Sequence, residues 1–337
     1  MTVPLWIWGA TCLVILGLFI FDFYSHVRTP HEPTIKESAW WSVVYVLLAL
    51  AFGGFVYAVW DHQHGIEYLT GYVTEKALSV DNLFVFALIM GAFQIPRKYQ
   101  QKVLLIGIAL ALVFRLVFIL LGASIINAWS DVFYLFGIFL LFTAAKMILD
   151  EVRDAPPTDP QDMWVIKLVR KVVPVTETYE SDHLTLKKNG KRYFTPLMVA
   201  LVAIGMVDVM FALDSIPAIY GVTQEAYLVF TTNAFSLLGL RQLYFLLDGL
   251  LDRLGYLSYG LSIILGFIGI KLIFHALHEN NLPFINGGES VHGVPEISTE
   301  ASLLVIVGVL VVTVVASLWK NKRDRRNEQT TGAPAHP

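Results

Sequence analysis

Charged residues are scarce in this chain. Asp, Glu, Lys and Arg make up 15% of its 337 residues, whereas about 25% is usual for a soluble protein. Hydrophobic residues make up 56%, and several charge-free runs reach about 20 residues, enough to cross the hydrocarbon core as a helix. Only helices and closed barrels satisfy their backbone groups in lipid. The composition therefore excludes a soluble protein and predicts an all-α polytopic membrane protein.

Cysteine is nearly absent too. Cys12 is the single cysteine, so a disulfide framework is excluded and cysteine indicates no redox compartment. The sequence also lacks a nucleophilic triad, a phosphate loop, a CxxC pair and a metalloprotease motif. His275 and Glu279 lie four residues apart near His278, but at a span end this is more typical of a membrane interface than of a zinc site. We therefore expect no enzyme and no cofactor.

Apolar runs predict nine transmembrane helices. Their approximate bounds are 4–22, 40–60, 67–93, 102–122, 131–150, 195–220, 226–247, 255–278 and 301–319. Five of the 24 Lys and Arg residues lie within these spans, and the other nineteen all lie in segments on one side of the membrane. Basic residues concentrate in cytoplasmic loops. This predicts a bacterial-type inner (plasma) membrane protein with its N-terminus outside and its C-terminus in the cytoplasm. No basic residue precedes Trp6, so we expect no cleavable signal peptide.

The spans divide the chain into six segments. They are two N-terminal helices (1–66), a first three-helix unit (67–150), a cytoplasmic loop (151–194), a second three-helix unit (195–278), an outer loop with the last helix (279–319) and a basic tail (320–337). We expect a short amphipathic helix near Met163–Val173, and disorder after Trp319. The basic loop residues are expected to meet lipid headgroups rather than nucleic acid.

Acidic residues recur in a matching pattern in the third and sixth spans. Glu75 and Asp81 lie six residues apart, as do Asp208 and Asp214. A small polar residue follows the second acid each time, Asn82 in one span and Ser215 in the other. Because each unit would contain three spans, an odd number of crossings, the units would have opposite orientations. Inverted repeats of this kind place transport sites near the membrane midplane.

Basic residues within the spans support the repeat. Arg115 and Arg241 lie in the second helix of each unit, and Lys146 and Lys271 lie in the third. With Lys76 they could simply neutralise the acids, which is the structural alternative to a transport site. Lys76 follows Glu75 but points about 100° away from it, so it could pair with an acid on another helix. Asn233 could hydrogen-bond across helices or line a pathway.

Helical geometry adds a condition to this site. Residues seven apart nearly coincide on a helix, whereas residues six apart point about 120° from each other. For Asp81 and Asp214 to face the other acids, both helices would have to unwind locally. Pro217 would favour this in the sixth span, because it frees the carbonyl of Leu213.

Clustered carboxylates in a membrane indicate a cation. An unpaired carboxylate there is costly, and four of them repel one another unless a cation or shared protons intervene. Carboxylate, amide, hydroxyl and carbonyl oxygens suit Mg²⁺, Ca²⁺ or Mn²⁺. The thioether of Met210, four residues before Asp214, could favour Mn²⁺, although a methionine in a span usually packs or faces lipid.

Three strings resemble the TerC family of integral membrane proteins. They are Glu75-Lys-Ala-Leu-Ser-Val-Asp-Asn-Leu-Phe-Val-Phe, Phe211-Ala-Leu-Asp-Ser-Ile-Pro-Ala and Thr232-Asn-Ala-Phe-Ser-Leu-Leu-Gly-Leu-Arg241. The resemblance covers residues 39–278 and extends over the nine spans. The family is named for tellurium resistance, and some members are associated with manganese export. It resembles a wider superfamily that includes lysine exporters and Golgi-type manganese/calcium exchangers. By resemblance, the metal-site residues are Glu75, Asp81, Asn82, Asp208, Asp214 and Ser215.

Residues and resemblance together predict a divalent cation exporter with Mn²⁺ as its substrate. We expect alternating access of the two units around the site and coupling to protons, because clustered carboxylates without a cation would share them. The alternatives are a transporter of Ca²⁺ or protons, and a non-transporting membrane scaffold in tellurite or envelope stress. The expected partners are the cation and the lipid bilayer, and the sequence predicts no oligomeric state.

Overall fold

The computed structural model describes residues 2–27, 33–93, 95–129, 131–153, 184–188, 191–247, 256–280, 282–283, 285–291 and 293–331. In chain order its elements are α1 (Leu5–Asp22), the π-helix η1 (Phe23–Val27), α2 (Ile35–Val59), α3 (His62–Ala92), α4 (Arg97–Ala128), α5 (Val132–Val152), β1 (Thr185–Lys188), β2 (Lys191–Phe194), α7 (Pro196–Tyr220), α8 (Ala226–Leu237), α9 (Leu240–Leu247), α10 (Leu257–His278), the 3₁₀ turn η4 (Asn286–Gly288) and α11 (Thr299–Thr331).

The helices confirm an all-α membrane protein. Seven described helices are long and apolar enough to cross a membrane, namely α1, α2, α4, α5, α7, α10 and α11. Two predicted spans complete the nine. Helix α3 carries the charges of Glu67, Glu75, Lys76 and Asp81, and the seventh span is divided into α8 and α9.

A polar cap begins the first helix of the candidate site. Asp61 precedes α3, and its carboxylate accepts a hydrogen bond of 2.8 Å from the backbone N–H of His64. This hydrogen bond satisfies one of the free N–H groups at the helix start, and it holds the pKa of Asp61 below its ordinary value. The chain turns back into the membrane at this point.

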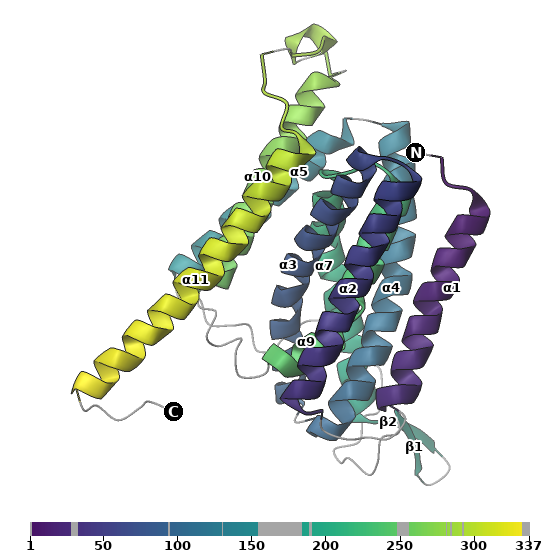
Figure 1. Ribbon diagram of the computed structural model, residues 1–337, viewed down its shortest axis with the longest axis vertical. Coiled ribbons are helices and arrows are strands. Elements are labelled where there is room, and N and C mark those ends of the chain that lie inside the picture. The colour runs from purple at the N-terminus through teal and green to yellow at the C-terminus, as the bar shows by residue number, and fades with distance from the viewer. Residues whose placement is uncertain are drawn as a thin grey trace.

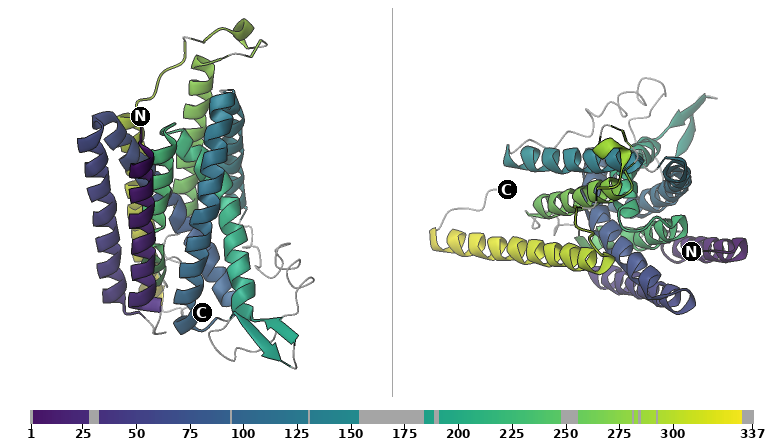
Figure 2. Two further views of the ribbon diagram at one scale, coloured as in Figure 1. Left: turned by 90° about the vertical axis from the view of Figure 1, so that its right-hand side faces the viewer. Right: turned by 90° about the horizontal axis from the view of Figure 1, so that it is seen from above.

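Helices α3, α4, α7 and α8 form the centre of the bundle. Helix α3 packs against α8, and α4 packs against α7. Helices α1 and α2 flank this centre on one side, while α5, α10 and α11 lie on the other (Figures 1 and 2). The chain begins at one end of the bundle, and α11 ends toward the other (Figure 1). A twofold repeat would produce these packing pairs, and the inverted repeat itself stays a prediction.

Two glycines allow α5 and α10 to pack closely along each other. A Cβ atom on Gly137 would lie 2.9 Å from the carbonyl oxygen of Gly269, and a Cβ on Gly269 would lie 3.0 Å from that of Gly137. Small residues let helix backbones approach in membranes, where apolar side chains give no hydrophobic drive to associate. These glycines fix the contact between the third helices of the two predicted units.

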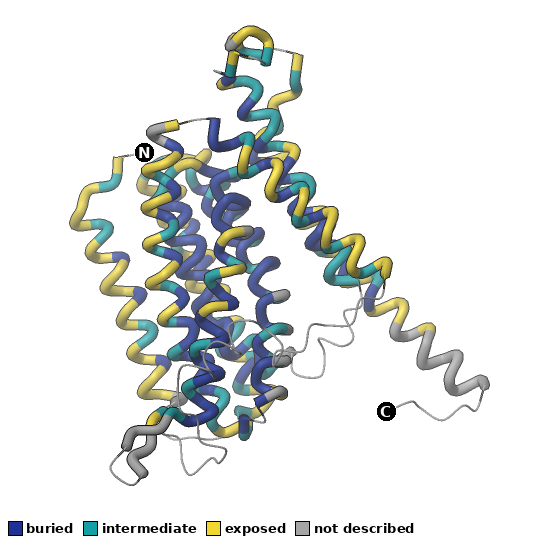
Figure 3. Tube along the Cα trace, turned by 180° about the vertical axis from the view of Figure 1, so that it is seen from behind, coloured by how far each residue is buried: buried dark blue, intermediate teal, exposed yellow. Residues whose placement is uncertain are grey.

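Burial is arranged as expected for a protein in lipid. Many apolar side chains are exposed on the outside of the bundle, including Leu5 (88%) and Leu304 (75%). Polar side chains are buried inside it, many of them on α3, α4, α7 and α8, and Figure 3 shows the buried positions gathered in the middle of the bundle. In a membrane the polar groups must find partners within the bundle, and the site is where they gather.

Two local expectations were wrong, a continuous seventh span and a disordered tail, and the local unwinding considered for two spans does not occur. Helices α3 and α7 are helical throughout, including residues 81, 214 and 217, so neither span is unwound. The interruption lies in the seventh span at Leu238–Gly239, where Gly239 has a φ of +77°. The chain beyond Trp319 is helical to Thr331 rather than disordered.

The loop between the units contains an unpredicted β-hairpin. Strands β1 and β2 pair antiparallel, with Lys188 opposite Lys191. The sequence Asn189-Gly190 between them is a strong hairpin signal. The amphipathic helix expected near Met163–Val173 lies outside the described residues.

Candidate functional site

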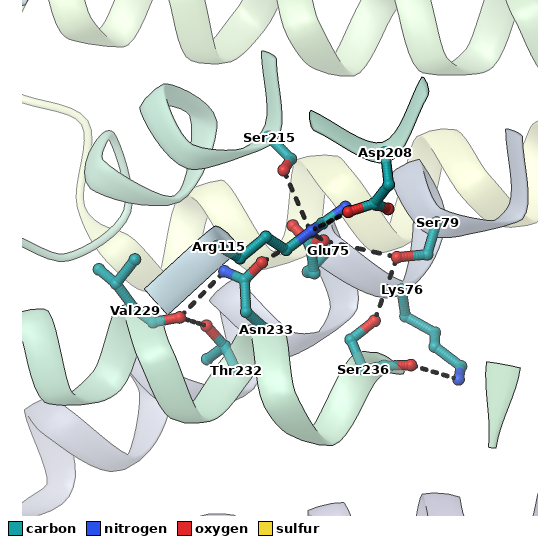
Figure 4. A network of polar contacts seen from close by, with 10 residues as sticks. All are labelled: Glu75, Lys76, Ser79, Arg115, Asp208, Ser215, Val229, Thr232, Asn233 and Ser236. Atoms are coloured by element: carbon teal, nitrogen blue, oxygen red, sulfur yellow. Dashed lines mark hydrogen bonds and ion pairs between the residues drawn. The ribbon is translucent and has the colours of Figure 1, made fainter. Parts of the chain in front are cut away.

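Arg115 is the centre of a buried polar network. It comes from α4, and its exposed fraction is 0%. Its Nε and Nη2 donate to the two carboxylate oxygens of Asp208 on α7 at 3.1 and 3.2 Å. Its Nη1 donates to Glu75 on α3, and both carboxylates converge on it in Figure 4. The planar guanidinium suits such paired recognition of carboxylates.

Two further residues complete the surroundings of the guanidinium. Arg115 Nη1 donates to the Asn233 side-chain oxygen on α8 at 2.7 Å and to the Ser215 hydroxyl on α7 at 3.3 Å. The Asn233 amide nitrogen donates to the Val229 carbonyl one turn earlier at 3.0 Å. This second contact orients the amide so that its oxygen faces Arg115. Four helices thus contribute to one network.

The network contains more acceptor capacity than it uses. Glu75 and Asp208 are 0% and 1% exposed, and one guanidinium serves both carboxylates. Within the described part of the chain, the Oε2 atom of Glu75 has no hydrogen-bond partner. A buried oxygen without a partner is costly. It therefore marks a position where a proton or a cation would be stabilised.

Lys76 lies beside this network but serves a different group. Its ammonium donates to the backbone carbonyl of Ser236 at 2.9 Å, at the end of α8 where the helix is interrupted. The ion pair expected with an acid on another helix is not among the contacts of the described residues. Lysine instead caps the last turn of α8, a position that favours a positive charge.

The structure brings together part of the predicted metal set. Glu75, Asp208 and Ser215 meet at Arg115. Asn82 is 4% exposed and lines a cavity described below. The side chains of Asp81 and Asp214 lie outside those that the structure describes, so the predicted metal role of the six residues stays a prediction.

One candidate ligand is placed elsewhere. Met210 is 50% exposed on the outer surface of α7, whereas Asp208 is buried. This exposure fits the lipid-facing methionine that is usual in a span, rather than a thioether ligand at the site.

Arg241 belongs to a second buried ion pair. Its guanidinium donates to both carboxylate oxygens of Asp22 at 2.8 and 3.1 Å, and to Gln101 at 2.5 Å. Tyr45 and Gln242 also donate to Asp22, at 3.0 and 2.9 Å. Arg115 and Arg241 therefore have different surroundings, although both were predicted to serve the acids of the two motifs. Asp22 was not identified from the sequence as an ion-pair partner. Its position as the one acid within the first apolar run was the signal that could have revealed it.

Two cavities lie in opposite halves of the bundle, and the smaller one reaches Ser215 of the network. One of about 490 Å³ lies beside the start of α3 and the end of α10, where Lys271, Glu67 and His275 line it. The other, of about 230 Å³, is lined by Asn82, Ser215 and, toward the end of α5, Lys146 and Asp150. Because α3 and α5 both run away from the chain's starting end (Figure 1), the second cavity opens toward the half in which α11 ends.

The ammonium groups in these cavities differ in their contacts. Lys271 donates to the Ser302 hydroxyl on α11 at 3.0 Å, and Lys146 is an exposed residue of α5. Among the described residues, the contacts of Glu75 and Asp208 include neither ammonium, so neither lysine takes the ion-pairing role considered for it there. Between the two cavities the side chains of Glu75, Arg115 and Asp208 are closed off from solvent.

The network offers oxygen ligands without a ready-made metal cluster. Among the described residues no three His, Cys, Asp or Glu side chains are grouped closely enough to hold a metal ion. Arg115 occupies the space between the two carboxylates instead. The carboxylate, amide and hydroxyl oxygens around it are those that hard cations prefer.

Comparison with known proteins places this architecture in one family. Residues 60–325 match the model of the integral membrane protein TerC family. An uncharacterized membrane protein of Mycobacterium tuberculosis (Rv2723) is 48% identical over 95% of this chain and 81% of its own length. An uncharacterized membrane protein of Myxococcus xanthus (STKORF319) is 35% identical over 94% of this chain and 93% of its own length. No solved structure matches the chain.

A named relative occurs in Escherichia coli K12. It is 36% identical over 94% of this chain and 95% of its own length, and its name assigns it provisionally as a membrane-bound redox modulator, Alx. The match of the family model covers all the helices of the Arg115 network. The chain belongs to the TerC family of integral membrane proteins.

Proposed function

We propose that this TerC protein exports a divalent cation, preferably Mn²⁺, through the site between α3 and α7. The observation that carries the proposal is the burial of Glu75 and Asp208 in the bundle, with an oxygen of Glu75 lacking a partner among the described residues. Ionisable groups kept inside a membrane despite their cost mark ion pathways and proton relays.

The charges of the two motif helices support a divalent substrate. Helices α3 and α7 carry the four acids Glu75, Asp81, Asp208 and Asp214 along their inner portions. Arg115 and Lys76 supply two positive charges to the described network, so four ionised acids set against these two leave two formal negative charges. One divalent cation would balance these charges, and so would two protons. Exchange of the cation for protons would therefore keep the membrane interior neutral.

The two cavities support alternating access. The smaller cavity would admit the cation at Asn82 and Ser215 from the half in which α11 ends, and the larger would release it past Glu67. With the basic segments in the cytoplasm, this direction is export. Movement of the two three-helix units around the closed centre would open one cavity at a time.

The preference for Mn²⁺ rests on the family resemblance together with the oxygen ligands. Hard cations in general suit carboxylate, amide and hydroxyl oxygens, so Ca²⁺ is the substrate to compare. The redox role in the name of the Escherichia coli relative gives no support for thiol exchange within this chain. Cys12 is its one cysteine, exposed on α1, and an internal thiol–disulfide cycle needs two.

Efflux of radioactive manganese from preloaded cells tests the proposal. The wild-type protein would be compared at matched membrane abundance with Glu75→Gln, Asp81→Asn, Asp208→Asn and Asp214→Asn. Glu289→Gln is the control, because Glu289 is an exposed loop residue. We expect the wild type and the control to export manganese and the four site variants to lose at least tenfold in rate.

The same assay separates the alternatives. Efflux of Ca²⁺ but not Mn²⁺ would show that the substrate is Ca²⁺, and the proposed transport site would stand. Wild-type cells that export neither cation faster than cells with an empty vector would contradict the transport function. Resistance to tellurite or envelope stress that persists in all four variants would favour the alternative of a non-transporting membrane scaffold.

A further inference from the structure

The end of α8 and the facing side of α3 form a second polar centre next to Arg115. Helix α8 ends at Leu237, and the chain turns at Leu238–Gly239 before α9 begins. The last carbonyls of a helix have no partner within it, and its carboxyl end carries partial negative charge. In transporters with interrupted helices, such ends coordinate cations. Here the interruption lies within the seventh span, beside Glu75.

Oxygen atoms line this centre. The Ser79 hydroxyl lies 3.5 Å from Glu75 Oε1 and 3.5 Å from the Ser236 hydroxyl. Ser79 and Ser236 are 0% exposed, and Figure 4 shows Ser79 between Glu75 and Ser236. The partnerless Oε2 of Glu75 belongs to the same carboxylate.

The spacing of these oxygens is wider than that of ordinary hydrogen bonds. Hydroxyl hydrogen bonds are normally about 2.5–3.0 Å long, so both contacts of Ser79 are long. Oxygens that ligate one cation octahedrally at about 2.1–2.4 Å lie roughly 3.0–3.4 Å apart. The observed separations are close to that range.

A positive charge already lies at this centre. The Lys76 ammonium donates to the Ser236 carbonyl at 2.9 Å. Its side chain runs away from Glu75 toward the end of α8 (Figure 4). With Arg115 it balances the charges of Glu75 and Asp208, so removal of Lys76 would leave the centre one negative charge in excess.

We propose that the carbonyl and hydroxyl of Ser236, the hydroxyl of Ser79 and the Glu75 carboxylate form a cation subsite, and that the Lys76 ammonium occupies its Ser236 carbonyl when no cation is bound. The arriving divalent cation displaces the ammonium, which returns when the cation leaves. Lys76 thereby lowers the affinity of the subsite and speeds release. This inference rests on the proposed function, since it names a subsite on the same pathway.

Binding of Mn²⁺ to the purified full-length protein in detergent tests the subsite, measured by isothermal titration calorimetry. Lys76→Met keeps the length of the side chain and removes its charge. Because a unit charge a few ångströms from the cation opposes binding strongly, we expect Lys76→Met to bind Mn²⁺ at least tenfold more tightly than the wild type. Lys76→Arg keeps the charge and should bind no more tightly than the wild type.

Two controls isolate the effect. Lys36→Met makes the same substitution at an exposed lysine at the start of α2 that lines neither cavity, and its affinity should change less than twofold. Ser79→Ala removes one proposed ligand and should weaken binding of Mn²⁺ at least threefold with an unchanged melting temperature. This second variant decides the question if Lys76→Met does not fold.

The outcomes separate the subsite from the transport function. An affinity of Lys76→Met equal to or weaker than that of the wild type overturns the subsite, as does unchanged binding in Ser79→Ala. Either result can occur while the wild type still exports manganese from cells, and then the transport function stands. Tighter binding in Lys76→Met without efflux by the wild type would support the subsite and contradict transport.

Discussion

Arg115 holds the two motif helices together at the scale of single residues. Its guanidinium joins Glu75 of α3 to Asp208 of α7, with Asn233 and Ser215 completing its surroundings. Each carboxylate would be costly alone in the membrane interior. The sequence predicted these acids and Arg115 as one site from their type and spacing. The contact of Lys76 with a backbone carbonyl could not be predicted from the sequence, because every residue type has a carbonyl and none marks where a helix breaks.

Replacing Arg115 should destabilise the protein severely. Arg115→Gln leaves two buried carboxylates without their counter-ion, and breaking a buried pair from one side costs about 3–5 kcal/mol. The melting temperature of the protein in detergent should fall on the order of 10 °C. Arg323→Gln is the matched control, because Arg323 is exposed on α11, and it should leave the melting temperature unchanged. Equal melting temperatures for both variants would mean that the network contributes little to stability.

At the scale of elements, the interruption between α8 and α9 positions both buried ion pairs. Helix α8 brings Asn233 to Arg115, and α9 brings Arg241 to Asp22. The sequence predicted one continuous span here and local unwinding near Pro217 instead. Pro217 lies in the last turn of α7, where the loss of one hydrogen bond is tolerated. Gly239 permits the true break, but a single glycine within an apolar run is not a specific signal.

Gly239→Ala should therefore disturb the break. A φ of +77° costs about 1–2 kcal/mol for a residue with a Cβ atom, and a Cβ here would lie 2.8 Å from Tyr45 Cβ. We expect a lower melting temperature and weaker binding of Mn²⁺, because α8 would no longer end beside Glu75. Gly308→Ala on α11, where a Cβ meets nothing within 4 Å, should change neither quantity. Normal melting and binding in Gly239→Ala would show that the break tolerates an ordinary residue.

At the scale of the whole molecule, the number and order of crossings followed from hydropathy and length. Each described helix overlaps a predicted span, including α3, whose charges lower its hydropathy. The hairpin β1–β2 and the extension of α11 to Thr331 were missed, because both are polar segments outside the lipid-length runs. The hydrophobic pattern of one helix shows which of its faces is buried but not which helix packs against it, so pairs such as α3 with α8 could not be predicted.

The orientation of the molecule can be tested by labelling single cysteines. In a Cys12→Ser background, Glu289→Cys and Arg323→Cys place one thiol at each end of the bundle, both at exposed positions. The basic segments should lie in the cytoplasm. A membrane-impermeant maleimide should therefore label position 289 in intact cells and position 323 only after permeabilisation. The reverse labelling pattern would mean that the smaller cavity faces outward, and the proposed direction of transport would then be import.

Transport by the purified protein in liposomes tests the central claim, that the buried Glu75 and Asp208 centre carries a divalent cation across the membrane. Uptake of radioactive manganese would be measured for the wild type, Glu75→Gln and Glu289→Gln at equal reconstituted amounts, beside protein-free liposomes. We predict uptake by the wild type and the control above the protein-free background, and uptake at background for Glu75→Gln. Wild-type uptake of Mn²⁺ and Ca²⁺ no faster than in protein-free liposomes, or full uptake by Glu75→Gln, would contradict the claim.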